Sequence, residues 1–515
     1  MVRESIVLGT GILILTNFAV KILSLIYRGV LIRLMGSEGL GLSEMVMPLF
    51  SFLLVLASLG IPLAISNLIS GDIKKAKTLS ILKTGITMLF ISSIFVTAAA
   101  LLIFPLVRDY ILSDPRIYLG FLLFFPSIIL ISVFSAYRGY FQGSHQSSFI
   151  GKSQSVEQVV RVSIGIALVY FLINANYRLS VLIGSLSVAT FFAELAGGIY
   201  LWLHFKKQKN SYKTKGKFSF DIAKKMLYMG GPITVSRIAT TAAITFQAVL
   251  IPKALILSGY TLSEAASLYG YFSGVALTIL HLPAIVTGAI TVPLIPSVAE
   301  AQKKKDIPLL HKRIRDSIMF TTYTAIPMLG FIFYFATPIC GILFAAKEAG
   351  PMLALFSLGG ILLYLQQPMV AVLQGLNYFK ELLLCLVIGD GLYIVMLVIC
   401  FMRQNFTIEM GIIAFIINDI ILLTSYIILL KFKTKIKLNL MGFTFIPMAY
   451  TFCGLFGVYI IKQYLNITYP NIWEIMIFGI VFIAIYLIML LLIDGKNNPL
   501  LSGVLTWRKH RSNRP

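Results

Sequence analysis

Runs of about twenty or more mainly apolar residues recur along the whole chain, and this pattern limits the fold more than any other feature. A helix needs about 20 such residues to cross the hydrocarbon core of a bilayer. The 515-residue chain is 58% hydrophobic and 12% charged, whereas soluble domains carry about 25% charged residues. In water this chain would expose large apolar patches, so we expect a bilayer to be its solvent. The first run lacks a small-residue cleavage site and is predicted to be a retained helix.

The runs predict an all-α integral membrane protein of about fourteen transmembrane helices. The predicted spans are 5–33, 42–69, 80–107, 117–140, 154–174, 179–204, 223–256, 264–298, 316–344, 351–376, 381–402, 408–430, 442–463 and 473–493. The least regular region is 316–376, where Pro327, Pro338 and Pro351 interrupt the apolar pattern. Proline is tolerated inside a spanning helix where neighbouring helices satisfy the freed carbonyl.

Most of the 43 lysines and arginines fall in alternate gaps between the runs, beginning with the N-terminal gap. Arg138 is counted with one of these basic gaps, at the end of the fourth span. Because cytoplasmic loops carry the excess of Lys and Arg, this bias predicts two cytoplasmic termini and an even number of spans. The net charge of +23 is therefore attributed to topology and to contacts with anionic membrane lipids, and no nucleic-acid partner is expected.

Two short motifs recur at nearly the same separation along the chain. The segment 61–66 (IPLAIS) resembles 292–297 (VPLIPS), and Gln142-Gly143 resembles Gln374-Gly375. This indicates two parallel repeats of six helices, and carriers of this kind hold their substrate between the halves. The predicted organisation is an N-terminal six-helix lobe, a basic cytoplasmic linker, a second six-helix lobe, and two additional helices with a basic cytoplasmic tail, at 1–204, 205–222, 223–437 and 438–515.

No catalytic or metal-binding pattern is found. The five histidines are isolated, and the four cysteines have neither metal nor redox spacing. There is no phosphate-binding glycine loop and no nucleophile elbow. We therefore expect a carrier rather than an enzyme, without a metal or cofactor, and we leave open whether H⁺ or Na⁺ drives it.

The first span carries a polar and basic stripe. Asn17, Lys21, Ser24 and Arg28 follow one another at intervals of three and four residues, and Arg33 lies about a turn beyond. Such spacing places them on one helix face. Because intramembrane charge is costly, this face is predicted to line a wet cavity and to bind an anionic substrate. The alternative is that Arg28 and Arg33 only reach out to the membrane surface.

The seventh span offers a second basic position. Arg237, Thr241 and Thr245 are spaced four residues apart, again on one face. Arg237 is a further candidate for substrate binding, and a structural ion pair is the alternative. Glu157 and Arg161 stand at i and i+4 in the order that favours an intrahelical ion pair, so a self-neutralised structural pair is the preferred interpretation there.

Acidic residues within the spans are candidates for binding a coupling ion or for neutralising a basic neighbour. Besides Glu157 they are Glu44, Glu194, Asp390 and Asp419. Glu44, in the second span, is expected to meet the stripe of the first. His281 can titrate near neutral pH, although a hydrogen-bonded structural role is equally open.

Three stretches carry a family resemblance: Met47–Ser66 (MPLFSFLLVLASLGIPLAIS), Tyr137–Gly143 (YRGYFQG) and Glu157–Val162 (EQVVRV). With them the chain resembles the stage V sporulation protein B group of polysaccharide-biosynthesis membrane proteins. That group lies in the multidrug/oligosaccharidyl-lipid/polysaccharide (MOP) flippase superfamily and is related to MurJ-type lipid II flippases.

The resemblance implies a multi-pass protein of the bacterial cell membrane that works by alternating access. It also implies a polyprenyl-pyrophosphate-linked saccharide as cargo, above all lipid II for peptidoglycan of the cell or spore, and cell-wall synthases as partners. Lipid II flippases use basic residues in a central cavity, and Lys21 and Arg28 stand where that cluster begins. Two alternatives stay open: a cation-coupled multidrug exporter of the same superfamily, and a non-transporting scaffold for cell-wall synthesis.

Overall fold

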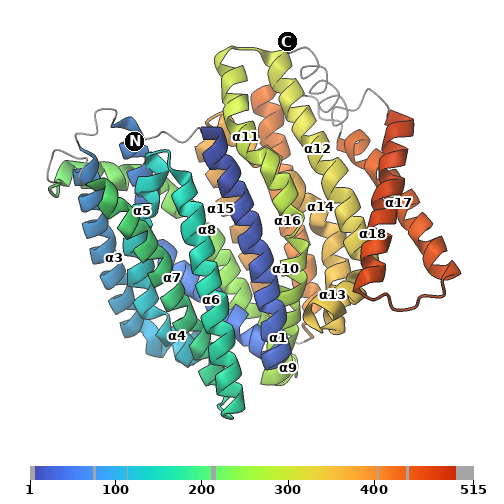
Figure 1. Cartoon of the computed structure of the whole chain (residues 1–515), viewed down its shortest axis with the longest axis horizontal. Coiled ribbons are helices and arrows are strands. Elements are labelled where there is room, and N and C mark those ends of the chain that lie inside the picture. The colour runs from blue at the N-terminus through green and yellow to red at the C-terminus, as the bar shows by residue number, and fades with distance from the viewer. Residues whose placement is uncertain are drawn as a thin grey trace. The chain divides into compact units, whose positions relative to one another are not determined.

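The computed structural model describes residues 6–72, 77–112, 114–209, 216–402, 405–436 and 440–494, and this part contains helices and turns but no strand (Figure 1). The chain forms two compact units. The first comprises Met1–Gly274 and Ile394–Ile408, and the second comprises Val275–Tyr393 and Glu409–Pro515. Each unit consists of residues that pack together in space. The division into two six-helix lobes and a C-terminal pair, made from the sequence repeat, stays a prediction.

Among the described residues, nine α-helices lie wholly in the first unit. They are α1 (Ile6–Ser58), α2 (Ile61–Gly71), α3 (Thr78–Leu106), α4 (Tyr118–Leu123), α5 (Phe125–Gly143), α6 (Ser147–Asn174), α7 (Leu179–Lys209), α8 (Phe220–Leu257) and α9 (Leu262–Tyr269). A π-helical turn, η1 (Val107–Ile111), prolongs α3, and a 3₁₀ turn, η2 (Pro115–Ile117), precedes α4.

The helices of the second unit are mostly long. They are α10 (Leu277–Leu280), α11 (Ala284–Lys303), α12 (Ile307–Tyr334), α13 (Ala336–Phe344), η4 (Lys347–Ala349), α14 (Gly350–Gly375), α17 (Leu440–Tyr464), α18 (Ile472–Met489) and η5 (Leu490–Asp494), together with α16 (Ile408–Thr434), whose first residue is counted with the first unit. The π-helical stretch η3 (Gly270–Ala276) and helix α15 (Phe379–Phe401) are divided between the two units.

Twelve helices in the described part of the chain are long and apolar enough to cross a membrane. The prediction of an all-α, multi-pass membrane protein is confirmed. Two of the fourteen predicted spans have no separate counterpart among the twelve. Span 42–69 is continuous with the first span in α1 and then broken before α2, and span 264–298 is divided into α9, η3, α10 and α11. The side of the membrane on which the termini lie stays a prediction.

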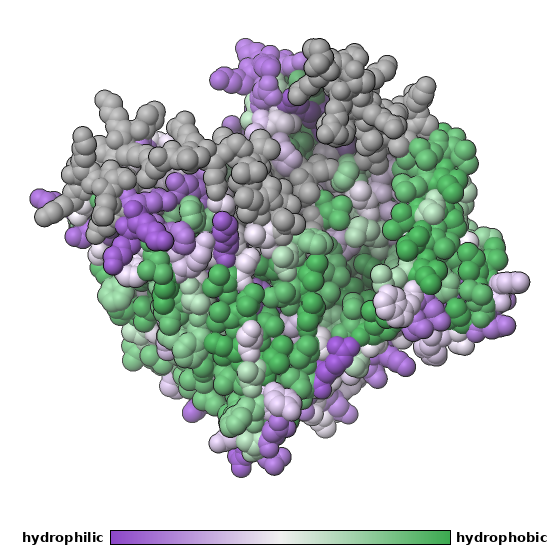
Figure 2. All heavy atoms as spheres, in the orientation of Figure 1, coloured by the Kyte–Doolittle hydropathy of each residue, from purple (hydrophilic) through white to green (hydrophobic). Residues whose placement is uncertain are grey.

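Apolar side chains remain exposed along the helices. Phe95 and Leu102 on α3 are 73% and 82% exposed, and Ile480 on α18 is 67% exposed. Figure 2 shows hydrophobic side chains along the length of the helices and hydrophilic ones toward their ends. In a bilayer such side chains contact lipid instead of water, so their exposure carries no penalty.

A single glycine divides α1 into two arms. Gly36 has φ 73° and ψ 176° in the middle of an otherwise helical run. Only glycine adopts this region without strain. The predicted loop between the first two spans is therefore reduced to one residue, and residues equally far from Gly36 on the two arms can lie opposite each other.

The second arm of α1 ends at Leu59 and Gly60, which both have positive φ. Pro62 then stands in the first turn of α2, where its missing N–H costs nothing. Gly60 also lies against the backbone of Gly230 in α8, and a Cβ at Gly60 would come within 2.5 Å of the Gly230 carbonyl oxygen. The predicted span 42–69 is thus wrong as one continuous helix, because a left-handed break is built into its middle.

The glycines of the two Gln-Gly motifs pack in the same way within their own units. Gly143 ends α5 and lies against the Ser66 carbonyl and the Ile69 Cβ. Gly375 ends α14 and lies against the Ile295 carbonyl and the Val298 Cβ. Each glycine thus meets a carbonyl and a side chain three residues further along a neighbouring helix. This equivalence gives the sequence repeat a structural counterpart.

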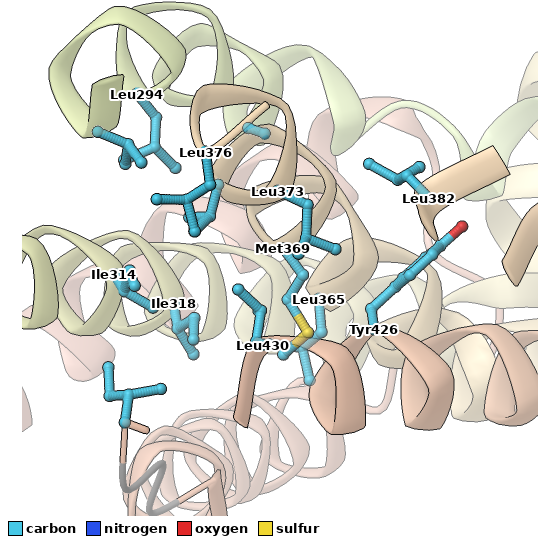
Figure 3. Close-up of a cluster of buried hydrophobic side chains, with 14 of the residues drawn as sticks. Leu294, Ile314, Ile318, Leu365, Met369, Leu373, Leu376, Leu382, Tyr426 and Leu430 are labelled. Atoms are coloured by element: carbon cyan, nitrogen blue, oxygen red, sulfur yellow. The ribbon is translucent and has the colours of Figure 1, made fainter. Parts of the chain in front are cut away.

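Aliphatic side chains from several helices form the core of the second unit (Figure 3). Met369 on α14 is fully buried, with Ile314 and Ile318 of α12 and Leu430 of α16 in the same cluster. The first unit has its own core, in which Ile65 of α2, Leu82 of α3, and Tyr140 and Phe141 of α5 are buried.

Candidate functional site

The two arms of α1 bring the first pair of predicted site residues together. Arg28 and Glu44 are equidistant from Gly36, and the Arg28 Nη2 atom lies 3.0 Å from the Glu44 Oε1 atom. The Arg28 side chain is 32% exposed and that of Glu44 is 12% exposed. Glu44 was expected to meet the basic stripe of the first span, and the structure places it against Arg28.

Ser273 of the π-helical stretch η3 joins this pair, since its Oγ donates to Glu44 Oε2 at 3.2 Å. This contact is possible because the backbone of α1 closely approaches the backbones of α9 and η3. A Cβ on Gly41 would overlap the Ala266 carbonyl, and one on Gly270 would overlap the Ser37 carbonyl. The carboxylate of Glu44 is therefore held by α1 itself and by η3.

The rest of the stripe is more open. Asn17 and Lys21 are exposed, and neither forms an ion pair with any residue in the described ranges. Ser24 donates to the Val20 carbonyl at 2.9 Å and so uses its proton within the helix. Arg33 is exposed and donates from Nη1 to the Gly29 carbonyl at 3.1 Å. Lys21 is thus an exposed cation of α1 that forms no ion pair with a described residue.

On α8, Arg237 is exposed and Thr241 donates to its carbonyl at 2.6 Å. One turn further on, Thr245 donates to the Thr241 carbonyl at 2.7 Å and approaches the Pro48 carbonyl of α1 at 3.1 Å. The predicted face of α8 is therefore turned partly toward the second arm of α1. Among the described residues, no carboxylate pairs with Arg237.

A second charged cluster joins α5, α6 and α7 inside the first unit. Arg138 Nη2 lies 2.6 Å from Glu157 Oε1 and 2.8 Å from Glu194 Oε2, and Arg161 Nη2 lies 2.9 Å from Glu194 Oε1. Ser153 approaches Glu157 Oε1 at 3.1 Å. Two arginines and two buried carboxylates neutralise one another, which is the arrangement that makes intramembrane charge tolerable.

The interpretation of Glu157 and Arg161 as a self-neutralised pair is wrong. Both residues project from α6, but Arg161 pairs with Glu194 and Glu157 pairs with Arg138. The i, i+4 rule considers one helix, whereas here neighbouring helices supply closer partners. Arg138 is the member that sequence reasoning missed. It lies within the spanning helix α5 and not in a basic gap, and its position inside the predicted span 117–140 was the signal that could have found it.

Two acidic candidates lie in the second unit. Asp390 on α15 and Asp419 on α16 are 6% and 4% exposed. Gln366 of α14 donates to Asp419 Oδ1 at 2.8 Å. Within the described residues, no lysine or arginine forms an ion pair with Asp419.

His281 follows α10 and is exposed, with its Nδ1 atom 2.6 Å from the Leu277 carbonyl. It thus has the hydrogen-bonded local role that the sequence left open. In the described part of the chain, no three His, Cys, Asp or Glu residues are grouped so that they could hold a metal ion.

The fold defines a class of protein: a polytopic, all-α membrane protein that carries charged clusters within its spanning helices. One solved structure that the chain resembles is the lipid II flippase MurJ in an inward closed conformation, with TM-score 0.71, 15% identity, and coverage of 95% of this chain and 99% of that one. Another is an inward-facing multidrug resistance MATE family transporter of the MOP superfamily, with TM-score 0.67, 14% identity, and coverage of 81% and 94%.

The chain belongs to the polysaccharide biosynthesis protein family, whose sequence model matches residues 6–302. A relative of nearly the same length is stage V sporulation protein B of Bacillus subtilis (strain 168), which is 26% identical over 95% of this chain and 96% of its own. The relatives and structural neighbours with a stated activity are transporters or flippases.

Proposed function

We propose that the chain is a flippase that moves a polyprenyl-pyrophosphate-linked saccharide, namely lipid II for peptidoglycan of the cell or spore, from the inner to the outer leaflet. One observation carries this proposal: α1 presents exposed Lys21 and paired Arg28 on a single face within a helix of a MurJ-like fold. Asn17, Ser24 and Arg237 would add polar and basic contacts to the headgroup. Arg33 would guide it at the end of the same helix.

The electrostatics favour an anionic cargo. A pyrophosphate that moves outward travels toward the positive side of the membrane and gains about 2.3 kcal/mol per charge at 100 mV. Lys21 has no counter-charge in the described part of the chain, so it supplies a binding partner during the crossing. Glu44 neutralises Arg28 while no cargo is bound, and the phosphate would compete with Glu44 for the guanidinium.

For the return step we propose a coupling cation, H⁺ or Na⁺, at the buried carboxylates of the second unit. Asp419 is buried and accepts from Gln366, and Asp390 is buried on the preceding helix α15. A buried carboxylate in a spanning helix is costly, and a bound proton or cation would lower that cost. The neutral cluster of Arg138, Glu157, Arg161 and Glu194 would serve as structural support.

The experiment is translocation of fluorescent lipid II by the full-length protein in proteoliposomes, followed by the accessibility of the headgroup on each face. A charge-assisted hydrogen bond contributes about 1.5–3 kcal/mol, so Lys21→Ala and Arg28→Ala should each lower the initial rate about tenfold or more. Lys152→Ala, at an exposed position on α6, is the control and should retain the wild-type rate.

The same assay distinguishes the alternatives. Retention of lipid II translocation by the Lys21→Ala/Arg28→Ala double variant would contradict the headgroup site. Export of cationic dyes without movement of lipid II would identify a multidrug exporter. Wild-type protein that moves neither, and that co-purifies with cell-wall synthases, would indicate a scaffold.

A further inference from the structure

A cavity of about 870 Å³ in the first unit is lined mainly by three helices, with further residues from η1 and α4. Leu56 of α1, Ala100 of α3 and Leu250 of α8 are among the residues that line it. Its size falls within the range of about 300–1,000 Å³ that is usual for ligand pockets. None of the candidate cargo-binding residues lines it, so this cavity is separate from the basic stripe of α1.

The walls of the cavity are apolar, and the few polar groups in them are already used. Ser92 donates to the Ala57 carbonyl at 2.6 Å, and Thr245 donates to the Thr241 carbonyl at 2.7 Å. The only other polar lining residues are Tyr110 and Lys253. A sugar or pyrophosphate would find no donors along such walls, whereas a hydrocarbon chain would bury apolar surface against them.

Lys253 places a positive charge at one end of the cavity. It lies near the C-terminal end of α8 and donates from Nζ to the Tyr110 carbonyl at 3.0 Å, with the Phe401 ring centroid 6.0 Å away. No carboxylate pairs with it in the described ranges, and the neighbouring Arg108 is neutralised by Asp109 at 2.7 Å. An ammonium has three donors, so this group can hold a phosphate at the mouth of an apolar channel.

The cavity is long enough to hold an acyl chain. Its lining residues extend from Ala242 to Lys253 on α8, from Leu49 to Leu59 on α1, and from Ser92 to Ile111 along α3 and η1. At 1.5 Å per residue the stretches on α1 and α8 cover about 15–17 Å and the one on α3 and η1 about 28 Å, which is at least half of the 30 Å hydrocarbon core. A glycerophospholipid whose headgroup stays at the surface reaches this depth with one acyl chain.

We propose that this cavity binds one acyl chain of an anionic glycerophospholipid, whose phosphate is held by Lys253. The lipid would be a resident ligand that fills the space between α1, α3 and α8. It is distinct from the transported cargo, so the proposal does not depend on lipid II being that cargo.

The test uses native mass spectrometry of the full-length protein, delipidated in detergent and titrated with phosphatidylglycerol or with phosphatidylcholine of the same chains. Wild-type protein should retain one tightly bound phosphatidylglycerol. Ala100→Phe, which fills the cavity, should lose that lipid, whereas Ala98→Phe, on the exposed neighbouring face of α3, should keep it. Lys253→Gln should weaken binding of phosphatidylglycerol about tenfold and leave phosphatidylcholine unchanged.

Cross-linking then locates the bound chain. Phosphatidylglycerol with a diazirine in one chain should label peptides of α3 and α8 in the wild type but not in Ala100→Phe. Equal retention of lipid by Ala100→Phe and Ala98→Phe would overturn the proposed site. Equal affinities for the two lipids in the wild type would overturn the role of Lys253. Displacement of the lipid by an equimolar polyprenyl phosphate would show that the occupant is a prenyl chain, against the proposal.

Discussion

At the scale of single residues, sequence spacing predicted one charged contact and misassigned another. Glu44 was expected near the basic stripe and pairs with Arg28, because a tight turn between two apolar runs leaves few other partners. Glu157 and Arg161 were expected to pair with each other and instead bind Arg138 and Glu194. The ion-pair partner of each residue depends on which helices pack on α6. A spacing rule for a single helix says nothing about those neighbouring helices.

The neutral cluster on α5, α6 and α7 should be sensitive to loss of one carboxylate. Glu194→Gln leaves Arg138 and Arg161 to share Glu157 within the membrane. We expect a loss of about 1–3 kcal/mol, the cost of an unsatisfied buried polar group, measured as a lower unfolding temperature in detergent by tryptophan fluorescence. Glu409→Gln, at an exposed position on α16, is the control. Equal unfolding temperatures for the two variants would contradict a supporting role for the cluster.

The pairing of Arg28 with Glu44 predicts an effect on cargo binding. Glu44→Gln removes the carboxylate that competes for the guanidinium. If the cargo is a pyrophosphate lipid, this variant should bind it several-fold more tightly and turn over more slowly, because release becomes harder. Binding is measured by titration with a polyprenyl pyrophosphate and turnover in proteoliposomes. Unchanged affinity would show that Arg28 does not contact the phosphate.

At the scale of helices, the apolar runs located most elements but not the breaks inside them. The predicted spans 154–174, 179–204 and 408–430 correspond to single helices. Span 42–69 is divided at Leu59 and Gly60, and span 264–298 is divided around η3 and His281. Hydrophobicity indicates that a segment lies in lipid. A bent or π-helical segment can lie in lipid as well as a straight helix can. Breaks depend on local φ and on close backbone contacts, which hydrophobicity does not encode.

Gly36 gives a direct test of one break. Nothing lies within 4 Å of a Cβ built there, so Gly36→Ala meets no steric neighbour and only its φ of 73° is unfavourable. We expect a loss of about 1–3 kcal/mol in stability from the backbone conformation alone. Gly391→Ala has equal space and ordinary helical φ in α15, so it should be neutral or slightly stabilising. Thermal unfolding of both variants in detergent measures the difference, and equal stability would show that α1 adopts another path.

At the scale of the whole molecule, composition and the apolar runs predicted a multi-pass, all-α membrane protein, and the Gln-Gly motifs of the internal repeat have a structural counterpart in Gly143 and Gly375. An apolar chain has few ways to satisfy its backbone in lipid, so helices could be predicted with little else. The specific contacts of Arg138, Ser273 and Gly230 could not, because they join segments far apart in the sequence and depend on packing.

The topology can be tested on intact cells. In a variant without the four native cysteines, single cysteines replace Lys206 and Lys304, in predicted cytoplasmic gaps, or Arg178 and Lys462, in predicted outer gaps. An impermeant maleimide should label Arg178→Cys and Lys462→Cys in whole cells and the other two only after permeabilisation. The reverse pattern, or labelling of one residue from each pair, would contradict cytoplasmic termini.

The break at Gly36 constrains the lengths of the two arms of α1 rather than their amino-acid composition. Since Arg28 and Glu44 face each other across equal arms, one residue inserted between Gly36 and Glu44 would rotate the carboxylate by about 100° and move it about 1.5 Å along the axis. Apolar substitutions in either arm leave the pairing intact, but a single-codon insertion or deletion would separate the two charges. Genetic variation in this segment should therefore consist of exchanges and almost never of indels.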